Sequence, residues 1–66
     1  DLAAREFEKV AAALPRDAEP AYNLAICRAN LGDPQGTERW MAEARRRPVV
    51  SDRLRTAARA AGLDYW

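Results

Sequence analysis

Apolar residues recur every three or four positions along most of the chain, which is the pattern of helices that bury one side. The first such run spans residues 2–14 and ends at Pro15. Proline ends it because it restricts the residue before it and has no amide hydrogen for a continuing helix. Arg16 and Asp17 then form a turn short enough to fold the next helix back antiparallel. The apolar positions of this run are Ala3, Ala4, Phe7, Val10, Ala11 and Leu14.

The second predicted helix covers residues 18–31 and is apolar on two sides. At about 100° per residue, Leu24, Cys27 and Leu31 share one side with Ala21, and this side is the predicted core face. Tyr22 and Ile26 lie on the other side, where a surface helix would be polar. These two residues either pack on a neighbouring repeat or line a binding surface, and the sequence leaves both interpretations open.

Turn residues predict two further helices, over residues 34–47 and 52–61. Gly32 suits the left-handed position after the second helix, and Asp33 followed by Pro34 suits the start of the third. The other end signals are the predicted N-caps Asp17 and Ser51 and the terminators Pro48 and Gly62.

These segments predict an all-α fold of antiparallel helical hairpins in one domain, residues 1–66. A chain of this size buries only about 60% of its unfolded surface, so its core is small. Because the chain opens at Asp1 inside an apolar run, we expect it to be a piece of a longer protein. No stretch approaches the roughly 20 apolar residues of a membrane span, so no membrane insertion is expected. The single cysteine cannot form an internal disulfide, which leaves the compartment open and favours a cytoplasmic location. In the tail, Tyr65 and Trp66 are expected to fold back onto the helices.

The composition excludes most enzymatic chemistry. Histidine is absent and Cys27 is the one cysteine, so imidazole-activated nucleophiles, thiolate metal sites and disulfides are not expected. The three glycines are scattered, so no phosphate-binding loop is expected either. We predict no catalytic residues, no metal and no cofactor, and Cys27 is interpreted as a small core residue.

The chain also matches itself when shifted by 33 residues. A period of about 34 residues with two helices per unit resembles the tetratricopeptide repeat, whose pattern runs W-x2-L-G-x2-Y, then A-x3-F, then P. The shift places Ala4, Phe7, Ala11 and Pro15 over Thr37, Trp40, Ala44 and Pro48.

The resemblance covers about residues 3–48 and is degenerate. Ala3, Phe7 and Pro15 fit the second half of the pattern, and Leu24 with the conservative Ala25 fits part of the first half. Further along, Thr37 and Met41 replace the alanine and the aromatic residue, and Pro48 comes one residue early. The resemblance implies a half repeat in residues 1–17, a repeat in residues 18–50 and a C-terminal capping helix in residues 51–66.

Arg28 departs from the pattern, because it stands near the core face where the family has a tyrosine. Its guanidinium either extends along its stem to solvent or pairs with a carboxylate, and the first arrangement is favoured.

If the resemblance holds, first helices of successive repeats line a concave groove that binds a peptide or protein segment. The family's best-known groove holds carboxylate tails with a lysine and an asparagine, but Tyr22 and Ile26 fill the matching positions here. This mode is therefore disfavoured. The candidate partner-binding residues are Glu19, Tyr22, Ile26, Ala29 and Asp33.

The second half of the chain is electropositive, with seven basic and two acidic residues in 39–59. An acidic protein surface is the favoured partner of this region, and nucleic acid is the alternative, weakened by the lack of stacking aromatics. Self-association through exposed repeat ends is a third possibility. The candidate basic patch consists of Arg45, Arg46, Arg47, Arg53, Arg55 and Arg59.

Overall fold

A computed structural model describes residues 2–63 of the chain. It contains four helices, α1 (Leu2–Ala13), α2 (Ala18–Asn30), α3 (Pro34–Arg46) and α4 (Asp52–Ala60), and no strand within the described residues. The predicted all-α fold is confirmed, and each helix ends within one residue of the predicted boundary. The predicted aromatic tail, Tyr65 and Trp66, lies outside the described residues.

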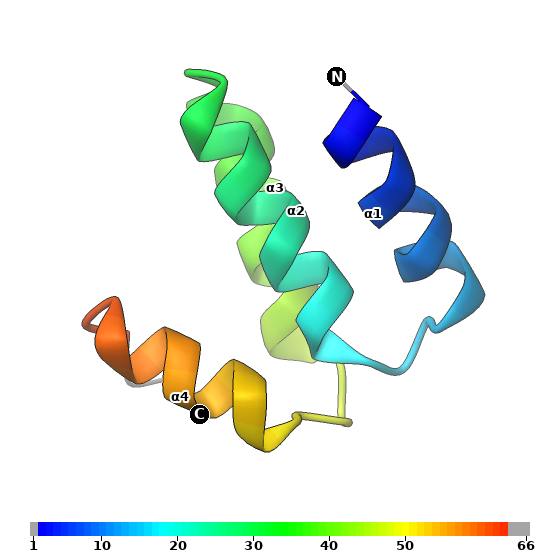
Figure 1. The fold of residues 1–66 in the computed structure, drawn as a ribbon, viewed down its shortest axis with the longest axis vertical. Coiled ribbons are helices and arrows are strands. Elements are labelled where there is room, and N and C mark those ends of the chain that lie inside the picture. Colours follow the sequence, from blue (N-terminus) through cyan, green and yellow to red (C-terminus); the bar gives the residue numbers. More distant parts are fainter. Residues whose placement is uncertain (1, 64–66) are drawn as a thin grey trace.

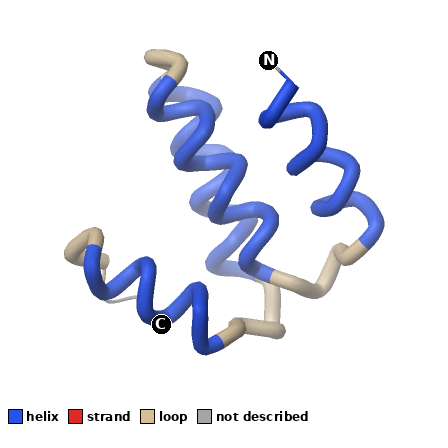
Figure 2. The backbone as a smooth tube through the Cα atoms, viewed as in Figure 1, coloured by secondary structure: helices blue, strands red, loops and turns tan. Residues whose placement is uncertain are grey.

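Helix α2 is the centre of the arrangement (Figure 1). Helix α3 runs antiparallel behind it as the second half of a hairpin, α1 lies on one flank, and α4 crosses near the beginning of α2 (Figures 1 and 2). None of the described helices has the length and apolar character needed to cross a bilayer. The part of the chain that is described holds one complete hairpin, α2–α3, so it does not define a superhelix.

Two glycines end helices in the left-handed conformation that the sequence predicts. Gly32 has φ of 73° and Gly62 has φ of 81°. After α2, the Gly32 N–H donates to the Ala29 carbonyl at 3.1 Å and the Asp33 N–H donates to the Arg28 carbonyl at 2.9 Å. This pair of bonds is the Schellman motif, which satisfies carbonyls left unpaired at a helix end. It turns the chain directly into α3.

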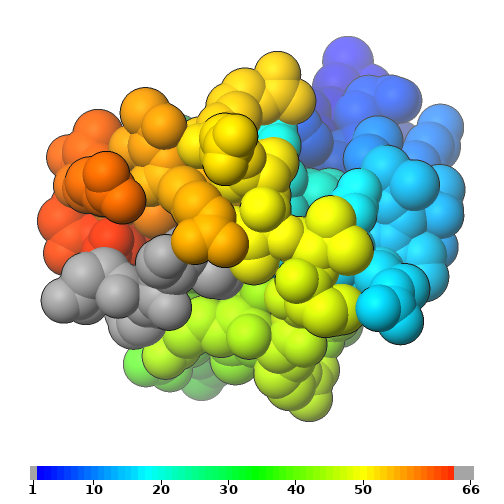
Figure 3. All heavy atoms as spheres, turned by 90° about the horizontal axis from the view of Figure 1, so that it is seen from below, coloured from blue at the N-terminus to red at the C-terminus, as the bar shows by residue number. Residues whose placement is uncertain are grey.

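The α1–α2 turn and the α3–α4 connection run side by side (Figure 3). The Val49 N–H donates to the Arg16 carbonyl at 3.0 Å, and the Ala18 N–H donates to the Val49 carbonyl at 2.8 Å. Arg16 and Val49 are related by the 33-residue shift. Equivalent turns of the internal repeat therefore contact each other through their backbones.

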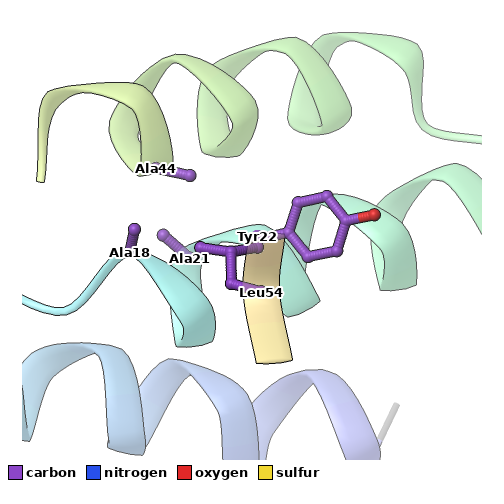
Figure 4. Packing of buried hydrophobic residues seen from close by; sticks show 5 residues of the cluster. All are labelled: Ala18, Ala21, Tyr22, Ala44 and Leu54. Atoms are coloured by element: carbon purple, nitrogen blue, oxygen red, sulfur yellow. The ribbon is translucent and has the colours of Figure 1, made fainter. Parts of the chain in front are cut away.

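The core consists of two clusters, each of which includes residues of α2, and it is rich in alanine, which lets the helices approach closely. Leu24 and Leu54 are its largest fully buried side chains. Leu24 packs between α1 and α2, as predicted, with Phe7, Cys27 and Trp40 around its cluster. The other cluster joins α2, α3 and α4 and consists of Ala18, Ala21, Tyr22, Ala44 and Leu54 (Figure 4).

Two sequence expectations about α2 are wrong. Tyr22 is only 5% exposed, because α4 lies over it and its ring packs beside Leu54 (Figure 4). It belongs to the core of this chain and is packed against α4, the predicted capping helix, and not against a neighbouring repeat. Leu31, predicted as core, is 51% exposed because it follows the last helical residue, where no described helix covers it.

Candidate protein-interaction groove

A groove lies between α1 and α2, and Arg53 of α4 also lines it. It has a volume of about 290 Å³. Phe7, Val10 and Leu14 form its apolar wall, here called the α1 stripe, because their spacing of three and four residues places them on one side of the helix. Val10 is 42% exposed and Leu14 is 48% exposed. The sequence predicts them as core, but the described residues cover only about half of each side chain.

The floor of the groove comes from α2. Glu19, Pro20 and Asn23 line it, and Glu19, Asn23 and Ile26 follow one side of the helix at intervals of four and three residues. Asn23 is half-buried and Ile26 is exposed. The accessible side of α2 is therefore rotated away from the predicted one, because α4 covers the side that carries Tyr22.

The five predicted partner-binding residues do not form one surface. Glu19 lines the groove, Tyr22 is buried, and Ile26 is exposed beyond the lining residues. Ala29 and Asp33 lie in a separate hollow at the α2–α3 turn. Asp33 is moreover the N-cap of α3, as predicted, since its Oδ1 accepts from the Gly36 N–H at 3.0 Å.

Glu19 joins α2 to the start of α4. Its Oε1 accepts from Ser51 Oγ at 2.7 Å, and its Oε2 accepts from Arg53 Nε at 2.8 Å. The hydrogen bond from Ser51, together with the hydrogen bond and charge of Arg53, lowers the pKa of Glu19, although partial burial acts in the opposite direction. Glu19 is thus an ionised structural residue whose oxygens already have partners.

Asp17, at the same end of the groove, has a carboxylate without such partners. It is the N-cap of α2, but its side chain makes no capping bond. Within residues 2–63 the carboxylate itself has no hydrogen bond or ion pair. The third residue of α2 is Pro20, which has no N–H to donate, so the usual capping bond to that position cannot form. In α3 the third position is Gly36, and there the bond forms. Asp17 is half-buried and lines the groove.

Arg47, predicted as part of the basic patch, is an internal residue. Its side chain is 9% exposed, and its Nη1 donates to the carbonyls of Ala11, Leu14 and Asp17 at 3.1, 3.2 and 3.0 Å. Its Nε donates to Glu43 Oε2 at 2.9 Å. Because α1 has no basic residue in its own last turn, Arg47 brings the positive charge that complements this helix end. The prediction that Arg47 contacts a partner is wrong.

Apart from Arg59, the other predicted basic residues also have interactions within the chain, and the Arg59 side chain has none among residues 2–63. Arg46 pairs with Glu43, and Arg53 pairs with Glu19. Arg46 and then Arg47 hold the pKa of Glu43 below its usual range by hydrogen bonding. Arg45 and Arg55 are exposed but interact within the chain, and Arg59 is exposed. At least three of the six arginines are therefore engaged by carboxylates or carbonyls of the chain itself.

Arg28 pairs with Glu8 of α1 at 3.0 Å, so the favoured expectation of a side chain directed only to solvent is wrong and the alternative of a carboxylate partner is confirmed. Cys27 is half-buried against the Leu24 cluster, as predicted. No group of potential metal ligands occurs within residues 2–63.

Sequence reasoning missed Val10, Leu14, Asp17 and Asn23 as groove residues. Two signals were present for them. Proline three residues after Asp17 prevents the usual capping bond, and the 33-residue shift aligns Val10 and Leu14 with Glu43 and Arg47, which are polar.

Comparisons with protein-family models, curated proteins and solved structures give no match for this chain.

Proposed function

We propose that this domain is a non-enzymatic interaction module that binds a segment of another protein in the groove between α1 and α2. The observation that carries the proposal is the α1 stripe, in which Val10 and Leu14 remain about half exposed beside a hollow. Apolar side chains gathered along a groove are typical of sites where an apolar partner binds. The absence of imidazole from the sequence is consistent with binding as the main activity.

A tetratricopeptide-like organisation is part of this proposal, with residues 18–50 as the repeat and the other segments as a half repeat and a cap. The paired turns at Arg16 and Val49, one repeat length apart, support it. In such arrays each repeat packs on its neighbours, and grooves between helices serve as binding surfaces.

Binding through the basic second half has less support, whether the partner is an acidic protein or nucleic acid. Nucleic-acid affinity depends on arginines that can neutralise phosphates. Arg47 is already committed to backbone carbonyls, and Arg46 and Arg53 to carboxylates. No observation favours nucleic acid as a second function.

The test is selection of random displayed peptides of about 16 residues, long enough to form helix on binding. Selected peptides are then measured against two double variants of the domain. Val10→Glu/Leu14→Arg gives α1 the charge pattern that α3 has at the matching positions, and we expect it to weaken binding by about tenfold or more. Arg45→Glu/Arg59→Glu, which changes exposed residues outside the groove, should leave binding within about twofold.

Selected peptides that bind the first double variant as well as the unaltered domain would overturn the groove as the site. Labelled oligonucleotides provide the competing arm. Binding near physiological salt that the Arg45→Glu/Arg59→Glu variant abolishes would replace the proposal with the nucleic-acid alternative.

A further inference from the structure

The groove combines an apolar wall with one unsatisfied charge. Of its ionised side chains, Glu19 and Arg53 neutralise each other, whereas the Asp17 carboxylate has no partner within the described residues. The lining therefore carries a net charge of −1 from three charged residues, two acidic and one basic. A carboxylate held beside apolar side chains favours a cationic partner, because opposite charges attract more strongly where water is partly displaced.

The shape of the groove selects a helix over an extended strand. Strand addition needs an open row of backbone N–H and C=O groups, but helices line this groove, and Arg47 takes the carbonyls of Ala11, Leu14 and Asp17 nearby. Phe7 of α1 and Leu14, which directly follows α1 and still bonds helically to the Val10 carbonyl, are seven residues apart, or about 10 Å along the helix axis at 1.5 Å per residue. An occupant helix would match this length with two turns of apolar side chains.

The charge lies at one end of the apolar wall. Along the chain, Leu14 is the member of the α1 stripe closest to Asp17, and Phe7 is the farthest. A cation that reaches Asp17 must therefore flank the occupant's apolar stripe and cannot lie in its middle.

We infer that the groove binds an amphipathic helix of a partner protein, with apolar residues on Phe7, Val10 and Leu14 and a flanking lysine or arginine on Asp17. This inference rests on the proposed function and names the chemistry of its partner. It assigns Asp17 a role in specificity, since the residue contributes no capping bond to α2.

The test uses synthetic helical peptides of about 18 residues with blocked ends. One peptide carries leucines over two turns of one side and an arginine one turn beyond them. A second has glutamine in place of that arginine, and a third has the arginine moved to the opposite side of the helix. Titration calorimetry measures each peptide against the domain, Asp17→Asn and the charge-matched control Glu38→Gln, which lies on α3 outside the groove lining.

We expect the first peptide to bind about fivefold more tightly than the other two. Asp17→Asn should remove that advantage and leave the glutamine peptide unchanged, whereas Glu38→Gln should leave the advantage intact. Circular dichroism of Asp17→Asn should show an unchanged melting transition, because the side chain makes no bond in the folded domain.

Two results would overturn the inference. Equal affinity for the arginine and glutamine peptides, or an arginine preference that survives Asp17→Asn, would show that Asp17 does not recognise the cation of the peptide. No binding of any helical peptide up to about 1 mM would show that the occupant is not a helix of this kind. Neither result decides the proposed function, because the selection of displayed peptides tests the groove without assuming that the partner is a helix or carries a charge.

Discussion

Helices α1 and α3 occupy equivalent positions in the internal repeat but have opposite chemistry on one face. Val10 and Leu14 of α1 correspond to Glu43 and Arg47 of α3 after the 33-residue shift. On α3 these two residues form an ion pair, and Arg47 reaches back to the end of α1. On α1 the matching residues are apolar and half exposed. The positions that hold the chain together near the end of α3 are therefore, at the end of α1, the positions that remain half exposed in the groove.

The polar residues at these positions near the end of α3 are already engaged within the chain. Arg47 pairs with Glu43 and also donates to carbonyls at the end of α1. Little of the hydrogen-bonding capacity of these two side chains therefore remains for a partner. Apolar residues can be satisfied only by contact with other apolar atoms. The predictions below separate what stabilises the domain from what it offers to a partner.

The largest effect is expected for the leucine that holds α1 on α2. Leu24→Ala removes a fully buried side chain from the cluster that contains Ala4 and Ala11, and should lower the free energy of unfolding by about 2–5 kcal/mol. In a domain this small, that change can unfold it. Leu31→Ala is the matched control on the same helix, and should cost less than about 1 kcal/mol because Leu31 is exposed. Urea denaturation followed by circular dichroism measures both, and similar losses would place Leu24 outside the core.

Replacing Arg47 with leucine, the residue at the matching position 14, should lower the free energy of unfolding by less than Leu24→Ala does. Arg47→Leu leaves the Ala11, Leu14 and Asp17 carbonyls without their charged donor and should destabilise the domain by about 2 kcal/mol. The matched control is Arg46→Leu, whose side chain is exposed and pairs only with Glu43, and it should change stability by less than about 0.5 kcal/mol. If the two substitutions have equal effects in urea denaturation, Arg47 is an ordinary surface residue and the contrast between α1 and α3 is wrong.

The smallest effect concerns the link between α2 and α4. Because the folded pKa of Glu19 is lowered, its carboxylate stabilises the fold above its unfolded pKa. This contribution is fully present above the unfolded pKa of about 4.3 and is lost in the acid window below it, as pH falls through the lower folded pKa. Glu19→Gln should therefore make the urea midpoint less dependent on pH in this window. Glu38→Gln removes an exposed carboxylate of α3 and should leave the dependence unchanged. A Glu19→Gln variant that behaves likewise would exclude the link of Glu19 to Ser51 and Arg53.

Local signals in the sequence predict the helices well. Pro15 and Pro48 mark ends of helical periodicity, and Gly32 and Gly62 have the left-handed backbone that their positions require. These features depend on a few neighbouring residues, which a sequence displays directly.

Long-range contacts decide what the sequence does not predict. Helix α2 is apolar on two sides, so periodicity alone cannot tell which side α4 will cover, and Tyr22 was placed on the wrong one. The contacts of Arg47 are likewise not predictable from its neighbours in the sequence. Arginine at a helix end is expected to complement its own helix dipole, but here it serves the end of α1, more than 30 residues earlier in the chain. The candidate groove depends on both contacts, that of α4 with the Tyr22 side of α2 and that of Arg47 with the end of α1.

The most direct test of the groove is a nuclear magnetic resonance titration of the isotope-labelled domain with a selected peptide. The account predicts that the largest shift changes occur at the methyl groups of Val10 and Leu14 and at the side-chain amide of Asn23, with small changes at Arg45 and Arg59. Shift changes concentrated at the arginines of α3 and α4, or at the α2–α3 turn around Ala29 and Asp33, with Val10 and Leu14 unmoved, would contradict it.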